Sequence, residues 1–143
     1  MIVKLTADET QRALDIGKAN VERVISKELR DFTNPTIDTL RAHQRGAAAE
    51  IAVAKALGLE SREGAFNERL DGDVGEYEVR SCSPNLNLML NQRDEKKKDR
   101  VFILVWCLGN QEFDIRGWAW GHDVIRPGHE FSVSGQRERL WRL

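Results

Sequence analysis

The sequence lacks the features that mark several common classes of protein. It has no run of about 18 apolar residues, which a membrane-spanning helix would need, and its N-terminus lacks the layout of a signal peptide. Its two cysteines, Cys82 and Cys107, fit neither a disulfide framework nor a metal-site spacing, and we expect them to pack in the core. These absences favour an intracellular, cytoplasmic protein without a membrane partner.

Two further absences concern chemistry. The 22 Lys and Arg residues are balanced by 23 Asp and Glu residues, so the net charge is −1 and any contact with nucleic acid must come from a local patch. The chain also has no phosphate-cradling glycine loop, no serine nucleophile elbow and no Cys/His cluster. Charged side chains therefore remain as the main candidates for chemistry.

The pattern of apolar residues predicts one α+β domain over residues 1–143, with a mixed sheet and the N-terminal helices packed against it. Thr6 and Glu9 form the pattern of a capping box at the start of the first helix, and Gly58 is expected to end a second helix over residues 36–57. Strands are expected at 1–5, 101–108 and 113–120, with a polar, irregular segment over 85–100 and a short strand or two after residue 126.

A tight hairpin is predicted within residues 70–80. Gly75 occupies the first position of a two-residue turn, where a positive φ is needed, so Val74 should pair with Tyr77. This register places Asp73 opposite Glu78 on one face of the hairpin.

Arg80 lies two residues after Glu78 and therefore points to the same face. Two carboxylates this close repel each other unless a cation lies between them, and that cation is either Arg80 or a divalent metal. Asp73, Glu78 and Glu50 from the second helix could bind Mg²⁺ or Mn²⁺. The alternative is a solvated hairpin in which Arg80 bridges the two carboxylates. Asp71 competes with Asp73, which we prefer because it pairs directly with Glu78.

Asp73 followed by Glu78-Val79-Arg80 resembles the Asp…(Asp/Glu)-x-Lys signature of the restriction-endonuclease-like, or PD-(D/E)XK, nuclease superfamily. The Ala-rich helix 46–58, which carries Glu50, resembles the helix that precedes this motif in many members. The apolar strand 101–108 follows as the superfamily core requires. Residues 113–118 resemble a strand ending in Gly-Trp that occurs in small phage-borne proteins of this type.

This resemblance implies a restriction-endonuclease-like core and a metal-dependent DNA nuclease, acting as an endonuclease or an exonuclease, that hydrolyses phosphodiester bonds with a metal-activated water. Asp73 and Glu78 would bind Mg²⁺ or Mn²⁺, with Glu50 as an additional ligand. Arg80 stands where the family has Lys, and it can orient water but cannot act as a base. The alternative is therefore a catalytically impaired nucleic-acid-binding or interaction module that retains the fold. Small members often dimerise to cut two strands, and exposed tryptophans would fit a homodimer.

Positive charge gathers between the hairpin and the strand at 101–108. This run is expected either to contact DNA phosphates or to be a solvated loop, and Arg45 on the second helix is a further candidate phosphate contact. The four tryptophans are expected in the core or an interface, with stacking on bases as the alternative. The cations of the run are Arg93, Lys96, Lys97, Lys98 and Arg100.

Overall fold

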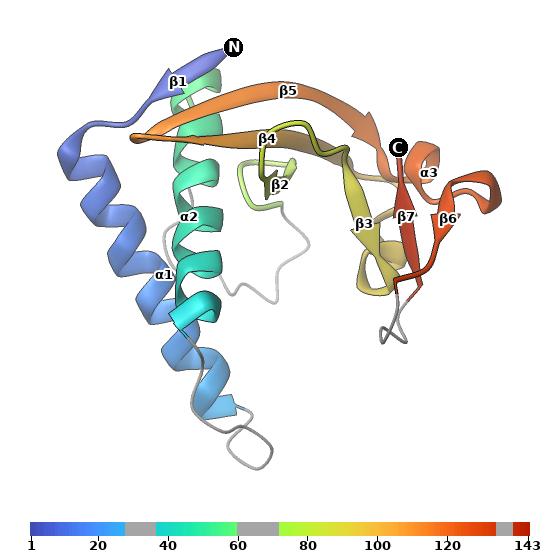
Figure 1. The fold of residues 1–143 in the computed structure, drawn as a ribbon, viewed down its shortest axis with the longest axis horizontal. Coiled ribbons are helices and arrows are strands. Elements are labelled where there is room, and N and C mark those ends of the chain that lie inside the picture. The colour runs from blue at the N-terminus through green and yellow to red at the C-terminus, as the bar shows by residue number, and fades with distance from the viewer. Residues whose placement is uncertain (28–36, 60–71, 134–138) are drawn as a thin grey trace.

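The structure is a computed structural model, and it describes residues 1–27, 37–59, 72–133 and 139–143. Two long helices, α1 (Ala7–Lys27) and α2 (Ile37–Leu57), lie at one side of a four-stranded sheet, and a three-stranded sheet lies at its other end (Figure 1). The expected α+β class, with a mixed sheet and helices packed on it, is confirmed. No helix within the described ranges is long and apolar enough to cross a membrane.

The larger sheet has the strand order β1-β5-β4-β2. β1 pairs antiparallel with β5, β5 pairs antiparallel with β4, and β4 pairs parallel with β2. The apolar strand predicted at 101–108 is confirmed as β4, which lies between two neighbours. The bounds are β1 (Ile2–Lys4), β2 (Glu78–Cys82), β4 (Val101–Gly109) and β5 (Glu112–Trp120).

The smaller sheet has the order β3-β7-β6 and joins distant parts of the chain. The prediction that residues 85–100 are irregular is wrong, because this segment forms a strand and a 3₁₀ helix that pack against the C-terminal strands. The elements are β3 (Met89–Asn91), the 3₁₀ helix η1 (Gln92–Lys97), α3 (Gly121–Val124), the 3₁₀ helix η2 (Pro127–His129), β6 (Glu130–Phe131) and β7 (Leu140–Arg142).

Local signals set the ends of the long helices. Thr6 Oγ1 accepts a hydrogen bond from the Glu9 N–H, and the Glu9 carboxylate accepts one from the Thr6 N–H, so the predicted capping box is confirmed. Gly58 ends α2 with a φ of 66°, and the Leu59 N–H donates to the Ala54 carbonyl. Such a left-handed residue is the usual end of an α-helix.

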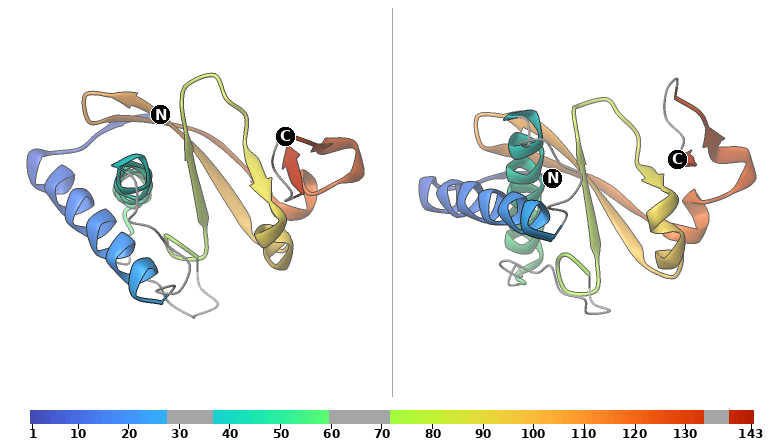
Figure 2. Two further views of the ribbon diagram at one scale, coloured as in Figure 1. Left: turned by 60° about the horizontal axis from the view of Figure 1, so that its bottom comes forward. Right: turned by 90° about the horizontal axis from the view of Figure 1, so that it is seen from below.

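Two apolar clusters lie on opposite faces of the larger sheet. α2 packs small residues such as Ala49 and Ala52 against Val79 and Ile103. On the other face, Phe102 packs with residues of the smaller sheet. Successive residues of a strand face opposite sides, so Glu78 and Arg80 lie on the Phe102 side, away from the face that α2 covers. Figure 2 shows the two helices and the smaller sheet well separated in both views.

The four tryptophans lie in different environments, and core packing is confirmed for Trp141 alone. Trp141 is buried in the second apolar cluster. Trp106 is half-buried and donates its indole N–H to the Leu86 carbonyl. Trp118 and Trp120 on β5 are exposed.

The close contact between α1 and α2 depends on Gly17. A Cβ atom at Gly17 would lie 2.5 Å from Cα of Gln44, whereas one at Gly46 would meet nothing within 4 Å. We expect Gly17→Ala to lower the free energy of unfolding by about 2 kcal/mol, because the helices must move apart. The matched variant Gly46→Ala should raise it by about 0.5–1 kcal/mol. Urea unfolding measures both, and equal effects of the two substitutions would contradict the prediction.

Candidate functional site

The predicted turn at Gly75 is confirmed, but the hairpin is very short. Val74 and Tyr77 form a bridge with reciprocal backbone hydrogen bonds, and Gly75 has a φ of 58°. The chain then enters β2, which pairs with β4. Asp73 Oδ2 accepts a hydrogen bond from the Val79 N–H at 2.8 Å, so its carboxylate lies at the start of β2. Residues 70 and 71, including the competing Asp71, lie outside the described residues.

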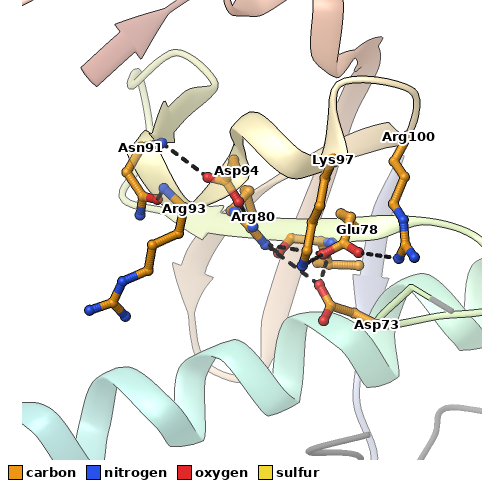
Figure 3. Close-up of polar contacts among 9 residues, drawn as sticks. Asp73, Glu78, Arg80, Asn91, Arg93, Asp94, Lys97 and Arg100 are labelled. Carbon is orange, nitrogen blue, oxygen red and sulfur yellow. Dashed lines mark hydrogen bonds and ion pairs between the residues drawn. The ribbon is translucent and has the colours of Figure 1, made fainter. Parts of the chain in front are cut away.

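Arg80 is surrounded by three carboxylates. Its Nη2 donates to Asp94 Oδ1 at 2.6 Å, while its Nη1 lies 3.6 Å from Asp73 Oδ2 and 3.9 Å from Glu78 Oε2 (Figure 3). The guanidinium also lies 5.1 Å from the centroid of the Phe102 ring. The expectation that Arg80 shares a face with two carboxylates therefore holds, but its shortest ion pair is with Asp94.

Glu78 is buried, with 1% of its surface exposed, and both of its oxygens are bonded to cations. Lys97 Nζ donates to Oε2 at 2.8 Å, and Arg100 Nη1 donates to Oε1 at 2.7 Å (Figure 3). A buried carboxylate requires such partners because its transfer out of water costs several kcal/mol. Removing one partner of a buried ion pair typically destabilises a protein by about 3–5 kcal/mol. Glu78 thereby connects β2 to η1 and to the residue before β4.

Asp94 is a functional candidate that sequence reasoning missed. It is buried, and its second oxygen accepts a hydrogen bond from the Asn91 N–H, while the Asn91 side chain caps η1 in return. An Asn followed three residues later by an acidic residue is a helix-start signal that the sequence contained. The charged cluster is defined here as Asp73, Glu78, Arg80, Asp94, Lys97 and Arg100.

Glu50 of α2 lies near the charged cluster, because the charges of Asp73, Arg80 and Glu78 act on its carboxyl group. Burial raises the pKa of its carboxyl to about 8, the negative charge of Asp73 adds to this rise, and Arg80 opposes it. Burial also raises the pKa of Asp73, although the hydrogen bond from Val79 lowers it in part. Glu50 is therefore protonated at neutral pH, and the crowded carboxyl groups hold less negative charge than their number suggests.

The side chains do not fit a metal ion as they stand. Both oxygens of Glu78 are occupied by Lys97 and Arg100, and Arg80 approaches Asp73 and Glu78 together. Among residues 1–27, 37–59, 72–133 and 139–143, no group of three or more His, Cys, Asp or Glu side chains could hold a metal ion. One physical reason why Glu78 and Glu50 do not form a common metal site is that side chains alternate along β2. This alternation turns Glu78 away from the sheet face that α2 covers.

The cations predicted to contact nucleic acid have different surroundings. Lys97 is committed to Glu78, whereas Arg93, Lys96 and Lys98 are exposed on or next to η1. Arg45 is exposed on α2, and its charge acts on the thiols of Cys82 and Cys107, whose pKa values burial raises. The structure therefore places Arg45 toward the end of β2, apart from the charged cluster.

The raised pKa of Glu50 predicts a pH-dependent stability. The folded chain holds a proton on Glu50 up to about pH 8, and an unfolded chain loses it near pH 4.5. The free energy of unfolding should therefore fall as the pH rises between these values. Glu50→Gln removes the ionisation, so we expect it to match wild type at pH 4 and to exceed it by on the order of 2 kcal/mol at pH 9.

Urea unfolding at both pH values measures this difference. The exposed residue Glu76 provides the control, since Glu76→Gln removes the same charge outside the charged cluster. A Glu50→Gln variant that keeps the pH dependence of wild type would contradict the prediction.

Comparisons with protein-family models, with curated proteins and with solved structures gave no match for this chain. A functional proposal for the charged cluster therefore rests on its own geometry and on the motif in the sequence. The features that support a functional proposal are the ion pairs of Glu78, the position of Arg80 and the exposed cations around η1.

Proposed function

We propose that this chain binds DNA, with the sugar–phosphate backbone lying against η1 and the exposed side of the charged cluster. The observation that carries the proposal is the density of cations on one short folded segment. Arg93, Lys96 and Lys98 are exposed there, beside Lys97 and Arg100 of the cluster. Lys96 and Lys98 form no ion pair with other described residues, so their ammonium groups are available to phosphates.

The fold is, in this proposal, a restriction-endonuclease-like core. Three features support it: the Ala-rich α2 that carries Glu50, the position of Asp73 at the start of β2, and the sequence Glu78-Val79-Arg80 within β2. Arg80 in place of Lys agrees with a protein that holds DNA without cutting it, because an arginine keeps its proton and cannot act as a base.

Salt dependence and charge reversal test DNA binding. We expect the dissociation constant for a fluorescent duplex to rise steeply between 50 and 200 mM NaCl, and Lys96→Glu/Lys98→Glu to reduce the slope of log Kd against log salt by about 2. The double variant should also weaken binding at least tenfold. Fluorescence anisotropy measures both.

A matched control is Lys4→Glu/Lys18→Glu, which changes the net charge equally at exposed positions on β1 and α1. This control should bind nearly as wild type does. Equal losses in the two double variants would show that binding follows net charge alone, and absence of binding at 50 mM NaCl would refute the proposal.

Metal-dependent phosphodiester hydrolysis, with Mg²⁺ or Mn²⁺ as cofactor, is the second candidate. The observation that favours it is the crowding of Glu50 and Asp73, whose raised pKa values mark a site with more carboxyl groups than its cations neutralise easily. Lys97 also supplies, next to Glu78, the ammonium group that position 80 lacks. The present side-chain arrangement does not hold a metal, so no step through one is derived.

A cleavage assay separates the two candidates. Single-stranded, duplex and branched DNA are incubated with Mn²⁺ or Mg²⁺ and wild type, Asp73→Asn, Arg80→Lys or the exposed control Glu76→Gln. Hydrolysis at this site predicts cleavage by wild type and Glu76→Gln and a rate about 100-fold lower in Asp73→Asn. Cleavage only by Arg80→Lys would instead identify the wild-type chain as catalytically impaired. DNA that is bound by all four proteins and cut by none would refute the hydrolysis candidate.

A further inference from the structure

A cavity of about 430 Å³ lies beside the charged cluster, between β2 and the smaller sheet. Its volume falls within the range of about 300–1,000 Å³ that is usual for small-molecule sites. Arg80 belongs to both features, because it lines the cavity and also bonds Asp94 of the cluster. The cavity therefore adjoins the charged cluster at Arg80.

The walls of the cavity combine an apolar floor with an aromatic face. Leu90 and Leu140 are almost fully buried, and Leu104 of β4 completes this floor. Phe131 of β6 contributes its ring, and the Arg142 guanidinium lies 4.9 Å from the centroid of that ring. The guanidinium lies over the ring, and a nucleobase can stack on such a pair of an aromatic ring and a guanidinium plane.

The rim of the cavity carries amides that can read the edge of a base. Asn85 and Asn87 are exposed, and their side chains form no hydrogen bond with other residues that the structure describes. An amide offers a donor and an acceptor together, which is the pairing that Asn makes with the edge of adenine. Asn85 also has a φ of 68°, a conformation that Asn adopts more readily than most residues.

We propose that this cavity binds one unpaired nucleobase of a DNA strand, stacked on Phe131, while the phosphate next to that base lies at Arg142. Arg142 lies on the cavity wall, and no described carboxylate pairs with it, so its guanidinium can bind an anionic group. Arg80 also lies on the wall, but its charge is taken up by the carboxylates of the cluster. A base inside a duplex cannot enter such a cavity without leaving its stack. The preferred substrate is accordingly DNA with unpaired bases, an inference that rests on the proposed DNA binding.

The test compares one oligonucleotide as a single strand and as a duplex, by anisotropy at low salt. We expect wild type to prefer the single strand about tenfold, and Phe131→Leu to remove this preference while leaving duplex binding unchanged. Asn87→Ala should weaken single-strand binding without affecting the duplex. Trp118→Leu is the matched control, because Trp118 is an aromatic residue with 66% exposure that lies outside the cavity.

A second measurement uses wild type and does not depend on whether a variant folds. A single 2-aminopurine in the strand should become shielded from acrylamide quenching when wild type binds, and a 2-aminopurine that stays fully quenched in the bound strand would contradict the base site. Deoxyadenosine monophosphate serves as a competitor, and we expect it to bind far more weakly than the oligonucleotide.

The outcomes distinguish the cavity from the wider DNA-binding surface. Equal affinity for single strand and duplex, unchanged by Phe131→Leu, would overturn the base site and leave the DNA-binding proposal intact. Loss of single-strand binding in Trp118→Leu as large as in Phe131→Leu would also overturn it. Binding of the monophosphate as tight as that of the strand would make the cavity a site for free nucleotides. Absence of binding to either DNA would refute both proposals.

Discussion

The buried carboxylate of Glu78 is the interaction on which the arrangement around β2 depends. Its side chain is 1% exposed, and its burial is offset by Lys97 and Arg100, which bond its two oxygens. These bonds fix η1 and the start of β4 relative to β2, and the backbone of Arg100 in turn bonds to Lys97 and Gly121. The position of the exposed cations on η1, and of Asp94 beside Arg80, follows from this one neutralised charge.

Features that depend on neighbours in sequence could be predicted. Thr6 and Glu9 form a capping box because the groups concerned are three residues apart, and Gly58 ends α2 because it adopts a left-handed conformation that other residues avoid. The turn at Gly75 follows for the same reason. β4 could be recognised because a strand covered on both faces needs apolar residues at nearly every position.

The partners of the site residues could not be predicted in this way. The sequence indicates that Glu78 and Arg80 share a face, but the face is decided by the parallel pairing of β2 with β4. Lys97 bonds Glu78 across 19 residues of sequence, and Asp94 bonds Arg80 across 14 residues. At such separations the order of charged residues in the sequence does not show which of them will pair. The polar segment 85–100 resembles a loop in sequence because it has few apolar residues. Two of these, Leu88 and Leu90, are nevertheless buried in the second apolar cluster.

The parallel pairing of β2 and β4 has a consequence for how this chain can vary. Two parallel neighbours cannot be joined by a tight turn, so the chain must travel back along the sheet before β4 begins. In this protein the return path is residues 83–100, which also carry Asn87, β3 and η1. Deleting this path would remove the strand pairing with it, so the segment cannot be trimmed as a surface loop can. Topology therefore sets a minimum length for this segment, and Asp94, Lys97 and Arg100 within it are further constrained by their ion pairs.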